Sequence, residues 1–205
     1  MKTIEEKRTL SRWFAANANW CVLFVQTYEE RRVASRIQDK LDKEVYAVFV
    51  PMKNYVHKKQ GKTTVRKIPW LSGYVFVAAM VEAEELANAV SPLILLDSTI
   101  YKLLSNDGDH ASILLSEKDK ALLTALLDEN FNIPPLEALV VGDKVELINN
   151  PLDGFDGEVL RVNLKKKTAM VRLKLLERTM DCELALELMI PKESTTINTP
   201  KNSCV

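Results

Sequence analysis

Apolar runs and charged segments alternate through the first 130 residues of the chain. Residues 20–26 form a continuous run of aromatic and β-branched side chains, which predicts a central strand covered on both faces. Residues 45–50 predict a second strand that stops at Pro51, and residues 74–80 predict a third. Between the first two, apolar residues recur every four positions over residues 29–41, which predicts an amphipathic helix.

Two further helices are expected in this part. Residues 82–90 and 117–127 each have acidic side chains in the first turn, where the helix dipole favours them, and Ser116 is a cap for the second. The short apolar pieces 94–96 and 100–104 are candidates for strands. Strands and helices in this order predict an α+β domain, an antiparallel sheet with flanking helices.

The periodicity changes after a segment that contains Pro134 and Pro135. Short alternating strands are expected at residues 157–163, 169–175 and 182–188, with turn residues between them, and this spacing predicts a small all-β barrel. The predicted boundaries are an extension at 1–19, an α+β domain at 20–128, a linker at 129–138, a barrel at 139–192 and a disordered tail at 193–205.

Composition narrows the class of protein. The 205 residues are 47% hydrophobic and 27% charged with zero formal net charge, which is ordinary for a soluble protein. No apolar run reaches the ~18 residues that cross a bilayer, and three cysteines without a CxxC pair indicate a reducing, cytoplasmic setting. Neither a paired-carboxylate motif nor a phosphate loop or metal-ligand spacing is present, so we expect neither an enzyme nor a cofactor.

The segment 68–77 connects a basic stretch to the third strand and is the centre of the functional interpretation. Trp70, Leu71 and Tyr74 give it more apolar surface than an ordinary loop has. These three side chains either anchor the loop to the core or form a docking surface for another protein, and the sequence leaves both alternatives open.

Two segments carry cations without acids. Residues 53–67 look like a hairpin with its tip at Gln60-Gly61, and residues 160–176 include a strand whose outward face carries Arg172 and Lys174. Each is either a solvated segment or a surface for nucleic-acid phosphates. The cations in question are Lys58, Lys59, Lys62, Arg66 and Lys67 in the first, and Lys165, Lys166, Lys167, Arg172 and Lys174 in the second.

From Trp20 to about residue 190 the chain resembles the NusG family of transcription elongation factors. The resemblance rests on Thr27 and Glu30 after the first strand, on Val50-Pro51 and on Gly73-Tyr74-Val75-Phe76-Val77. The second part is similar to a KOW domain in Gly142-Asp143-Lys144-Val145 and in residues 150–157. The hairpin and residues 150–155 look most like the LoaP antiterminator branch, although Asn150 stands where that branch usually has glycine and Ser72 where the family usually has proline.

The resemblance implies that the N-terminal domain binds a coiled coil on the largest subunit of a bacterial RNA polymerase through Trp70, Leu71 and Tyr74. It further implies that the basic hairpin lies near upstream or non-template DNA, and that the factor suppresses pausing or termination. A general elongation factor would use Leu152 and Phe155 of the KOW domain to bind a small-subunit ribosomal protein or a termination factor. A LoaP-like factor would bind a structured nascent RNA hairpin.

Two other possibilities follow. A KOW protein that binds the ribosome or RNA without any polymerase role is the second class of function. Some specialised relatives mask the polymerase site with a helical KOW domain, and residues 175–189 contain many strong helix formers, although residues 169–175 alternate as a strand does.

Overall fold

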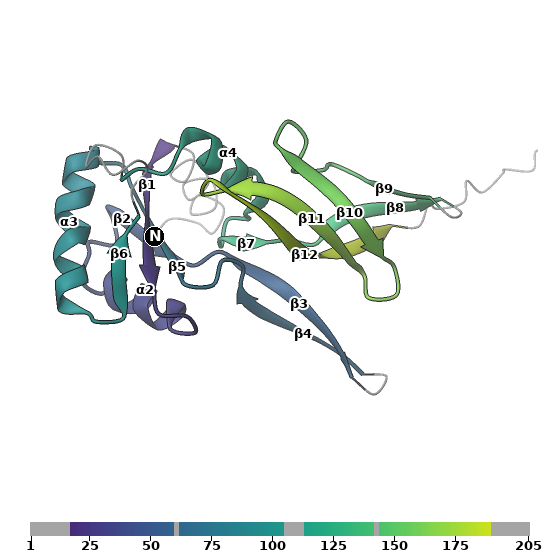
Figure 1. Cartoon of the computed structure of the whole chain (residues 1–205), viewed down its shortest axis with the longest axis horizontal. Coiled ribbons are helices and arrows are strands. Elements are labelled where there is room, and N and C mark those ends of the chain that lie inside the picture. Colours follow the sequence, from purple (N-terminus) through teal and green to yellow (C-terminus); the bar gives the residue numbers. More distant parts are fainter. Residues whose placement is uncertain (1–16, 60–61, 105–112, 142–143, 190–205) are drawn as a thin grey trace, which may run out of the picture.

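The computed structural model describes residues 17–59, 62–104, 113–141 and 144–189. Most of the expected extension and all of the expected tail lie outside these ranges. An α+β domain and an all-β domain lie side by side, and a long hairpin of the first extends along the second (Figure 1).

A four-stranded antiparallel sheet forms the centre of the first domain. Its strands are β1 (Asn19–Val25), β2 (Tyr46–Phe49), β5 (Tyr74–Ala79) and β6 (Ile100–Leu103), in the order β2-β5-β1-β6. The expected central strand is confirmed, because β1 pairs with β5 on one side and β6 on the other. Alternate residues of β1 and β5 enter two different cores, one on each face of the sheet.

Helices α2 (Glu30–Gln38) and α3 (Ala83–Leu96) cover one face of this sheet. Leu86, Val90 and Leu93 of α3 are buried against it. The expectation of a strand at residues 94–96 was wrong, because α3 continues through Pro92 to Leu96. Burial of Leu93 one turn beyond Val90 stabilises this last stretch although Pro92 lacks a backbone donor.

The opposite face carries α4 (Glu117–Leu126). Ser116 caps this helix as expected, since its Oγ accepts a 3.1 Å hydrogen bond from the Asp119 backbone N–H. Leu122, Leu123 and Leu126 pack into the core that contains Trp20 and its aromatic neighbours. Trp20 makes an edge contact with Phe49, with ring centroids 5.1 Å apart.

The predicted basic hairpin is confirmed as strands β3 (Met52–Lys59) and β4 (Lys62–Pro69), which pair antiparallel along their whole length. A short strand, β7 (Asn132–Ile133), adds to the base of β3. The tip at Gln60-Gly61 lies outside the described residues.

The second domain is a five-stranded, nearly closed barrel, in the order β10-β11-β12-β8-β9. The predicted fold class, an α+β domain followed by a small β barrel, is therefore confirmed. The strands are β8 (Leu136–Val141), β9 (Lys144–Leu147), β10 (Gly157–Asn163), β11 (Thr168–Leu175) and β12 (Arg178–Met189). Residues 129–138, expected as a linker, include β7 and the start of β8. Most of residues 175–189, for which a helix was considered, form β12.

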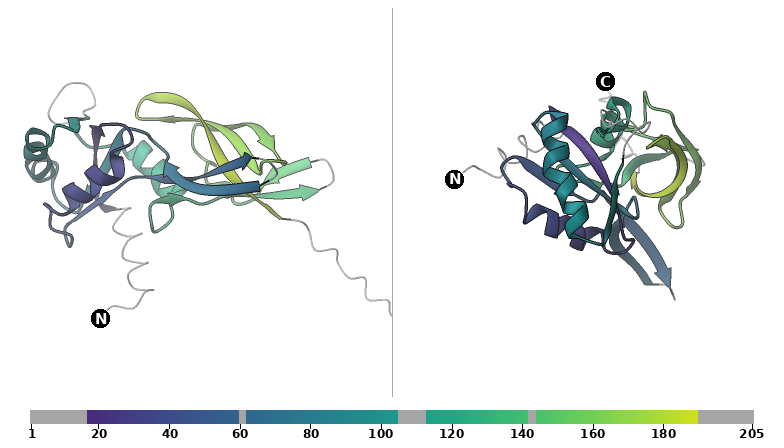
Figure 2. Two further views of the ribbon diagram at one scale, coloured as in Figure 1. Left: turned by 90° about the horizontal axis from the view of Figure 1, so that it is seen from below. Right: turned by 60° about the vertical axis from the view of Figure 1, so that its left-hand side comes forward.

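The two domains share one apolar core. Trp70 and Leu71 of the first domain belong to the same buried cluster as Leu173, Leu175 and Leu184 of the barrel. Strand β12 also lies against β3, and the views from below and from the side show the hairpin running beside the barrel (Figure 2). The barrel packs on the same sheet face as α4, over the part that α4 leaves uncovered, and we call this packed state the closed arrangement.

Candidate functional site

The loop between β4 and β5 holds the candidate docking residues at the junction of the two domains. Trp70 is anchored by its backbone N–H, which donates to the Pro51 carbonyl over 2.7 Å. Its side chain is 7% exposed and that of Leu71 is 3% exposed, whereas Tyr74 is half-buried. Trp70 and Leu71 are therefore not accessible to another protein while the two domains are packed together.

Strand β12 supplies polar contacts at this junction. Lys53 Nζ donates to the Glu183 carbonyl over 3.1 Å, and Arg178 Nη1 donates to the Tyr74 hydroxyl over 3.4 Å. The first contact is half-buried and the second is exposed. Both join the first domain to the barrel across the buried loop.

The indole of Trp70 is the least satisfied polar group at the junction. Its Nε1 is buried and makes no hydrogen bond of standard geometry with the described residues. The Cys182 thiol is its neighbour: burial raises the pKa of Cys182, and the Trp70 N–H and the Lys53 charge oppose the rise. Since thiol sulfur is a weak acceptor, we regard this contact as poor compensation for a buried donor.

A third polar contact joins α4 to the barrel. Lys118 at the start of α4 bonds Asp156 Oδ2 over 2.6 Å, and both side chains are more than half exposed. The same barrel loop carries the two residues considered for a protein partner. Leu152 is 2% exposed and part of the core, and Phe155 is half-buried and packs against it.

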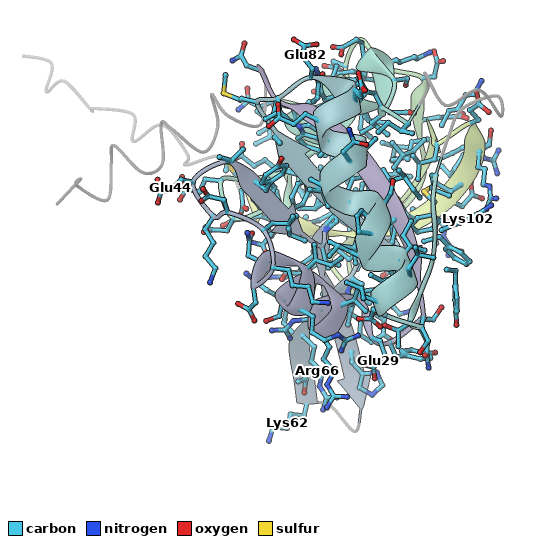
Figure 3. All side chains as sticks on the ribbon, turned by 90° about the vertical axis from the view of Figure 1, so that its left-hand side faces the viewer. Glu29, Glu44, Lys62, Arg66, Glu82 and Lys102 are labelled. Atoms are coloured by element: carbon cyan, nitrogen blue, oxygen red, sulfur yellow. The ribbon has the colours of Figure 1, made fainter. Side chains whose placement is uncertain are left out.

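The hairpin cations lie on two different faces. Because side chains alternate along a strand, Lys62 and Arg66 share one face of β4, which Figure 3 shows at the end of the molecule remote from α3. Lys67 lies on the other face and donates to Asn132 Oδ1 over 3.1 Å. The side chains of Lys58 and Lys59 lie outside what the structure describes.

Tyr55 and His57 add a short aromatic row to the face that carries Arg66. Their rings are nearly parallel, with centroids 6.2 Å apart, and Tyr55 is 41% exposed and pairs across the hairpin with Arg66. An exposed aromatic beside a cation is a platform on which an unpaired base can stack. Sequence reasoning missed this row, although the spacing of two residues in a predicted strand could have indicated it.

The barrel cations do not form one cluster. Lys165, Lys166 and Lys167 lie in the exposed turn between β10 and β11, whereas Arg172 is five residues along β11, about 17 Å from Lys167 for an extended strand. Arg172 forms a two-pronged ion pair with Asp181 of β12, at 2.7 and 2.9 Å. This hydrogen bond and charge raise the pKa of Arg172 and lower that of Asp181. The sequence could not place Asp181 opposite Arg172 without the register of the strands.

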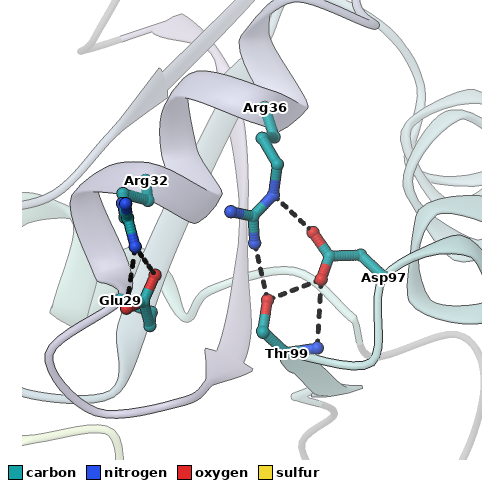
Figure 4. A network of polar contacts seen from close by, with 5 residues as sticks. All are labelled: Glu29, Arg32, Arg36, Asp97 and Thr99. Carbon is teal, nitrogen blue, oxygen red and sulfur yellow. Dashed lines mark hydrogen bonds and ion pairs between the residues drawn. The ribbon is translucent and has the colours of Figure 1, made fainter.

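Glu30, one of the residues that carry the family resemblance, is 2% exposed and accepts a hydrogen bond from Gly73 in the loop of the candidate docking residues. Nearby, Arg36 and Thr99 bond Asp97 and join α2 to the end of α3 (Figure 4). Neither network resembles a reactive centre.

Among the described residues, no group of three or more His, Cys, Asp or Glu side chains is placed to hold a metal ion, and no helix is long and apolar enough to span a membrane.

Comparison with known proteins identifies the family of the first domain. A family model described as "Transcription termination factor nusG" matches residues 18–119, which span the sheet, the hairpin and the start of α4. The chain carries a NusG domain. This result confirms the family resemblance of the first domain, and the match does not extend into the barrel.

Solved structures support the fold of both parts. The structure "Domain interaction in Thermotoga maritima NusG" is 17% identical, with a TM-score of 0.51 over 84% of this chain and 96% of that one. A chain of "MjSpt4:Spt5 complex conformation B" is 16% identical over 81% of this chain and 91% of that one, but its TM-score of 0.28 is too low to support an argument. No curated protein matches the chain in sequence. The shared architecture, a NusG domain followed by a barrel, is thus shown as a fold, and the family match covers the first domain only.

Proposed function

We propose that this protein is a non-enzymatic elongation and antitermination factor that binds RNA polymerase through the NusG domain. Trp70, Leu71 and Tyr74 form the contact, and the partner is the coiled coil of the largest catalytic subunit. The supporting observation is the buried, poorly satisfied indole of Trp70. An apolar anchor whose N–H needs an acceptor suits a desolvated pocket at a protein interface, where aromatic residues contribute most of the binding energy.

The closed arrangement gives this proposal a regulatory step. The barrel covers Trp70 and Leu71, so polymerase and barrel compete for one surface. Binding then requires the domains to separate, and the polymerase affinity is reduced by the fraction of molecules that are closed. In this proposal the masking is done by a β barrel, not by a helical form of the KOW domain.

Recruitment by nucleic acid is the second part of the proposal. The KOW domain binds a structured nascent RNA through Lys165, Lys166 and Lys167, as a LoaP-like factor does. Lys62 and Arg66 on the hairpin approach upstream or non-template DNA. The turn lysines are exposed and make no ion pair among the described residues, which leaves their charge available for phosphates.

The experiment that tests polymerase binding uses full-length protein and core RNA polymerase. Lys118→Glu places a second acid against Asp156 and weakens the closed arrangement, so it should raise the polymerase affinity about two- to fivefold, the size of an exposed ion pair. Adding Asp156→Lys should restore the original affinity. Trp70→Ala should lower affinity more than tenfold while circular dichroism shows an intact fold.

Polymerase affinity that is unchanged in Trp70→Ala would contradict the proposed contact. Absence of any polymerase binding, together with retained RNA binding, would favour a ribosome- or RNA-associated KOW protein. A general factor, whose KOW domain binds a ribosomal protein or a termination factor, would instead be indicated by loss of such binding in Phe155→Ala. Since Leu152 is a core residue, Phe155 is the better position for that test.

A further inference from the structure

A cleft of about 420 Å³ lies between the two domains, and one of the basic segments found in the sequence forms its rim. The hairpin contributes one wall, the turn between β10 and β11 contributes the rim, and β12 with Pro135 closes the base. The lining residues are Asn54, Val56, Thr63, Val65, Pro135, Lys165, Lys166, Lys167, Ala185 and Leu186. A volume of this size is in the range of small-ligand sites.

The rim is cationic and held in shape by the backbone of the turn. The Lys166 N–H donates to Asn163 Oδ1 over 2.9 Å, and the Lys167 carbonyl accepts from the Leu186 N–H over 2.8 Å. Lys167 has a φ of 55°, which costs a side chain roughly 1–2 kcal/mol that glycine would avoid. The lysine therefore occupies a position that backbone energetics alone would give to glycine.

These three lysines differ from two other cations of the molecule, Arg172 and Lys118. Arg172 is neutralised by Asp181, and Lys118 of the NusG domain is paired with Asp156. By contrast, the lysines of the rim have no ion pair or hydrogen bond from their ammonium groups within the described residues, and no acid is among the residues that line the cleft. The cleft is thus a concave site with uncompensated positive charge.

The hairpin wall is apolar, with two hydrogen-bonding groups. Val56 and Val65 pair directly across the hairpin, and Val65 is 57% exposed, so the pair presents a flat apolar surface to the cleft. Asn54 and Thr63 lie on the same face and provide an amide and a hydroxyl. A planar ring with polar edges fits this wall, and an anionic group attached to it would reach the lysines. A nucleotide has both parts.

We propose that this cleft holds one unpaired nucleotide of an RNA strand, with its base against Val56 and Val65 and its phosphate at Lys165–Lys167. The proposal rests on the proposed function of the barrel as the RNA-binding part and adds the hairpin to that site. Unpaired bases of RNA can be splayed out of the helix and hydrogen-bonded along their edges, which Asn54 and Thr63 allow here. Because both domains build the cleft, the unpaired nucleotide is held there only in the closed arrangement. When polymerase separates the domains, the RNA stays bound through the lysines of the barrel turn alone.

The test measures binding of full-length protein to a synthetic RNA hairpin with a single-nucleotide bulge and to the same hairpin fully paired. We expect the bulged RNA to bind about tenfold more tightly, which corresponds to burial of roughly 50 Å² of apolar base surface. Val65→Glu should abolish this difference. Thr64→Glu adds the same charge one residue away, on the opposite face of β4, and should preserve it.

Three outcomes would overturn the proposal. The first is equal binding of the bulged and paired hairpins, and the second is an equal effect of Val65→Glu and Thr64→Glu. The third is tighter binding of a free mononucleotide than of the bulged RNA, since the ligand would then be a free nucleotide and not part of a strand.

A charge variant separates this proposal from the function on which it rests. Lys165→Glu/Lys167→Glu should lower affinity for both RNAs at least tenfold, and Lys40→Glu, an exposed lysine after α2, should lower it less than twofold. If the double variant weakens binding but the bulge has no effect, the barrel binds RNA without the cleft. If the double variant binds both RNAs normally, the turn is not an RNA site and the proposed recruitment fails as well.

Discussion

The buried carboxylate of Glu30 accepts a 2.7 Å hydrogen bond from the backbone N–H of Gly73. Glu30 is the first residue of α2, and Gly73 lies between Leu71 and Tyr74, two of the proposed docking residues. Gly73 in turn offers its carbonyl to the Val25 N–H over 2.8 Å. The loop that carries the candidate polymerase contact is thereby joined to the helix and to the central strand.

Removal of the Glu30 carboxylate should destabilise the NusG domain. Glu30→Ala leaves the Gly73 N–H buried without an acceptor, which should lower the free energy of unfolding by about 2 kcal/mol. Glu30→Gln retains an acceptor and should cost about half as much. The measurement is urea unfolding. Glu29→Ala, which removes only an exposed pair with Arg32, should change stability by less than about 0.5 kcal/mol and is the matched control.

Replacing Gly73 with alanine should lower the free energy of unfolding by more than the cost of its positive φ alone. Gly73 has a φ of 83°, and a Cβ there would lie 3.1 Å from Cε2 of Phe24. Gly154 has a φ of 86° with open space around it. Gly154→Ala should therefore cost about 1–2 kcal/mol, the backbone penalty, and Gly73→Ala should cost at least 1 kcal/mol more in urea unfolding. Equal losses would show that Phe24 moves aside freely.

The Asp97 network should make stability depend on acid pH. Burial alone would raise the pKa of Asp97, but hydrogen bonds from Thr99 and Arg36 and the Arg36 charge lower it to about 2. A carboxyl whose pKa falls on folding stabilises the protein above its unfolded pKa, near 4, and loses this effect as the pH falls toward 2. Asp97→Asn should thus cost about 1–2 kcal/mol at pH 7, limited because Arg36 is 43% exposed.

The measurement for Asp97 is the difference in unfolding free energy between the wild type and Asp97→Asn, taken from pH 7 to pH 2. The difference should be constant above pH 5 and shrink between pH 4 and pH 2. Asp39→Asn removes only an exposed pair with Lys43, so it should change stability by less than about 0.5 kcal/mol at pH 7. A difference between wild type and Asp97→Asn that persists unchanged at pH 2 would contradict the assignment of this acid sensitivity to Asp97.

Asp181 should restrain anion binding by the barrel. Its carboxylate forms an ion pair with the guanidinium of Arg172. Asp181→Asn should therefore leave Arg172 available for phosphates and raise affinity for a structured RNA about two- to fivefold. The affinity should also depend more steeply on salt. Arg172→Ala alone should lower affinity by a similar factor, because it leaves the Asp181 carboxylate without its cation, whereas Arg172→Ala/Asp181→Asn removes both charges and should change affinity less than twofold. A fluorescence titration at two salt concentrations measures both effects, and reduced affinity in Asp181→Asn would contradict this role.

The sequence predicted the elements well where one pattern dominated. The run at residues 20–26 could only be buried on both faces, and the hairpin followed from Gln60-Gly61 between two basic stretches. The residues that line the domain junction were less accessible. From the sequence, Trp70 was equally suited to a core and to a docking surface. In the structure it lies on the surface of the first domain and is buried there by the barrel. Helix α3 ran past the expected end because burial of Leu93 outweighed Pro92.

For the candidate nucleic-acid surfaces, the sequence predicted the direction of the side chains but not their partners. Strand periodicity placed Arg172 and Lys174 correctly on the outward face of β11. It could not supply the partner, since Asp181 becomes a neighbour only through the register of β11 and β12. Likewise, the cleft depends on the packing of the barrel beside the hairpin, and no local pattern in either segment encodes that contact.

The pairing of the hairpin has a consequence for solubility. Strand β3 is paired on one side with β4 and at its base with β7, which leaves the outer edge of β4 open. Open edges invite pairing with other chains, and charged side chains along them oppose it. Strand β4 carries three such charges: Lys62 at the end near the hairpin tip, and Arg66 and Lys67 near the base. Neutralising all three would therefore change more than the proposed DNA contacts, because the hairpin would then become a template for self-association.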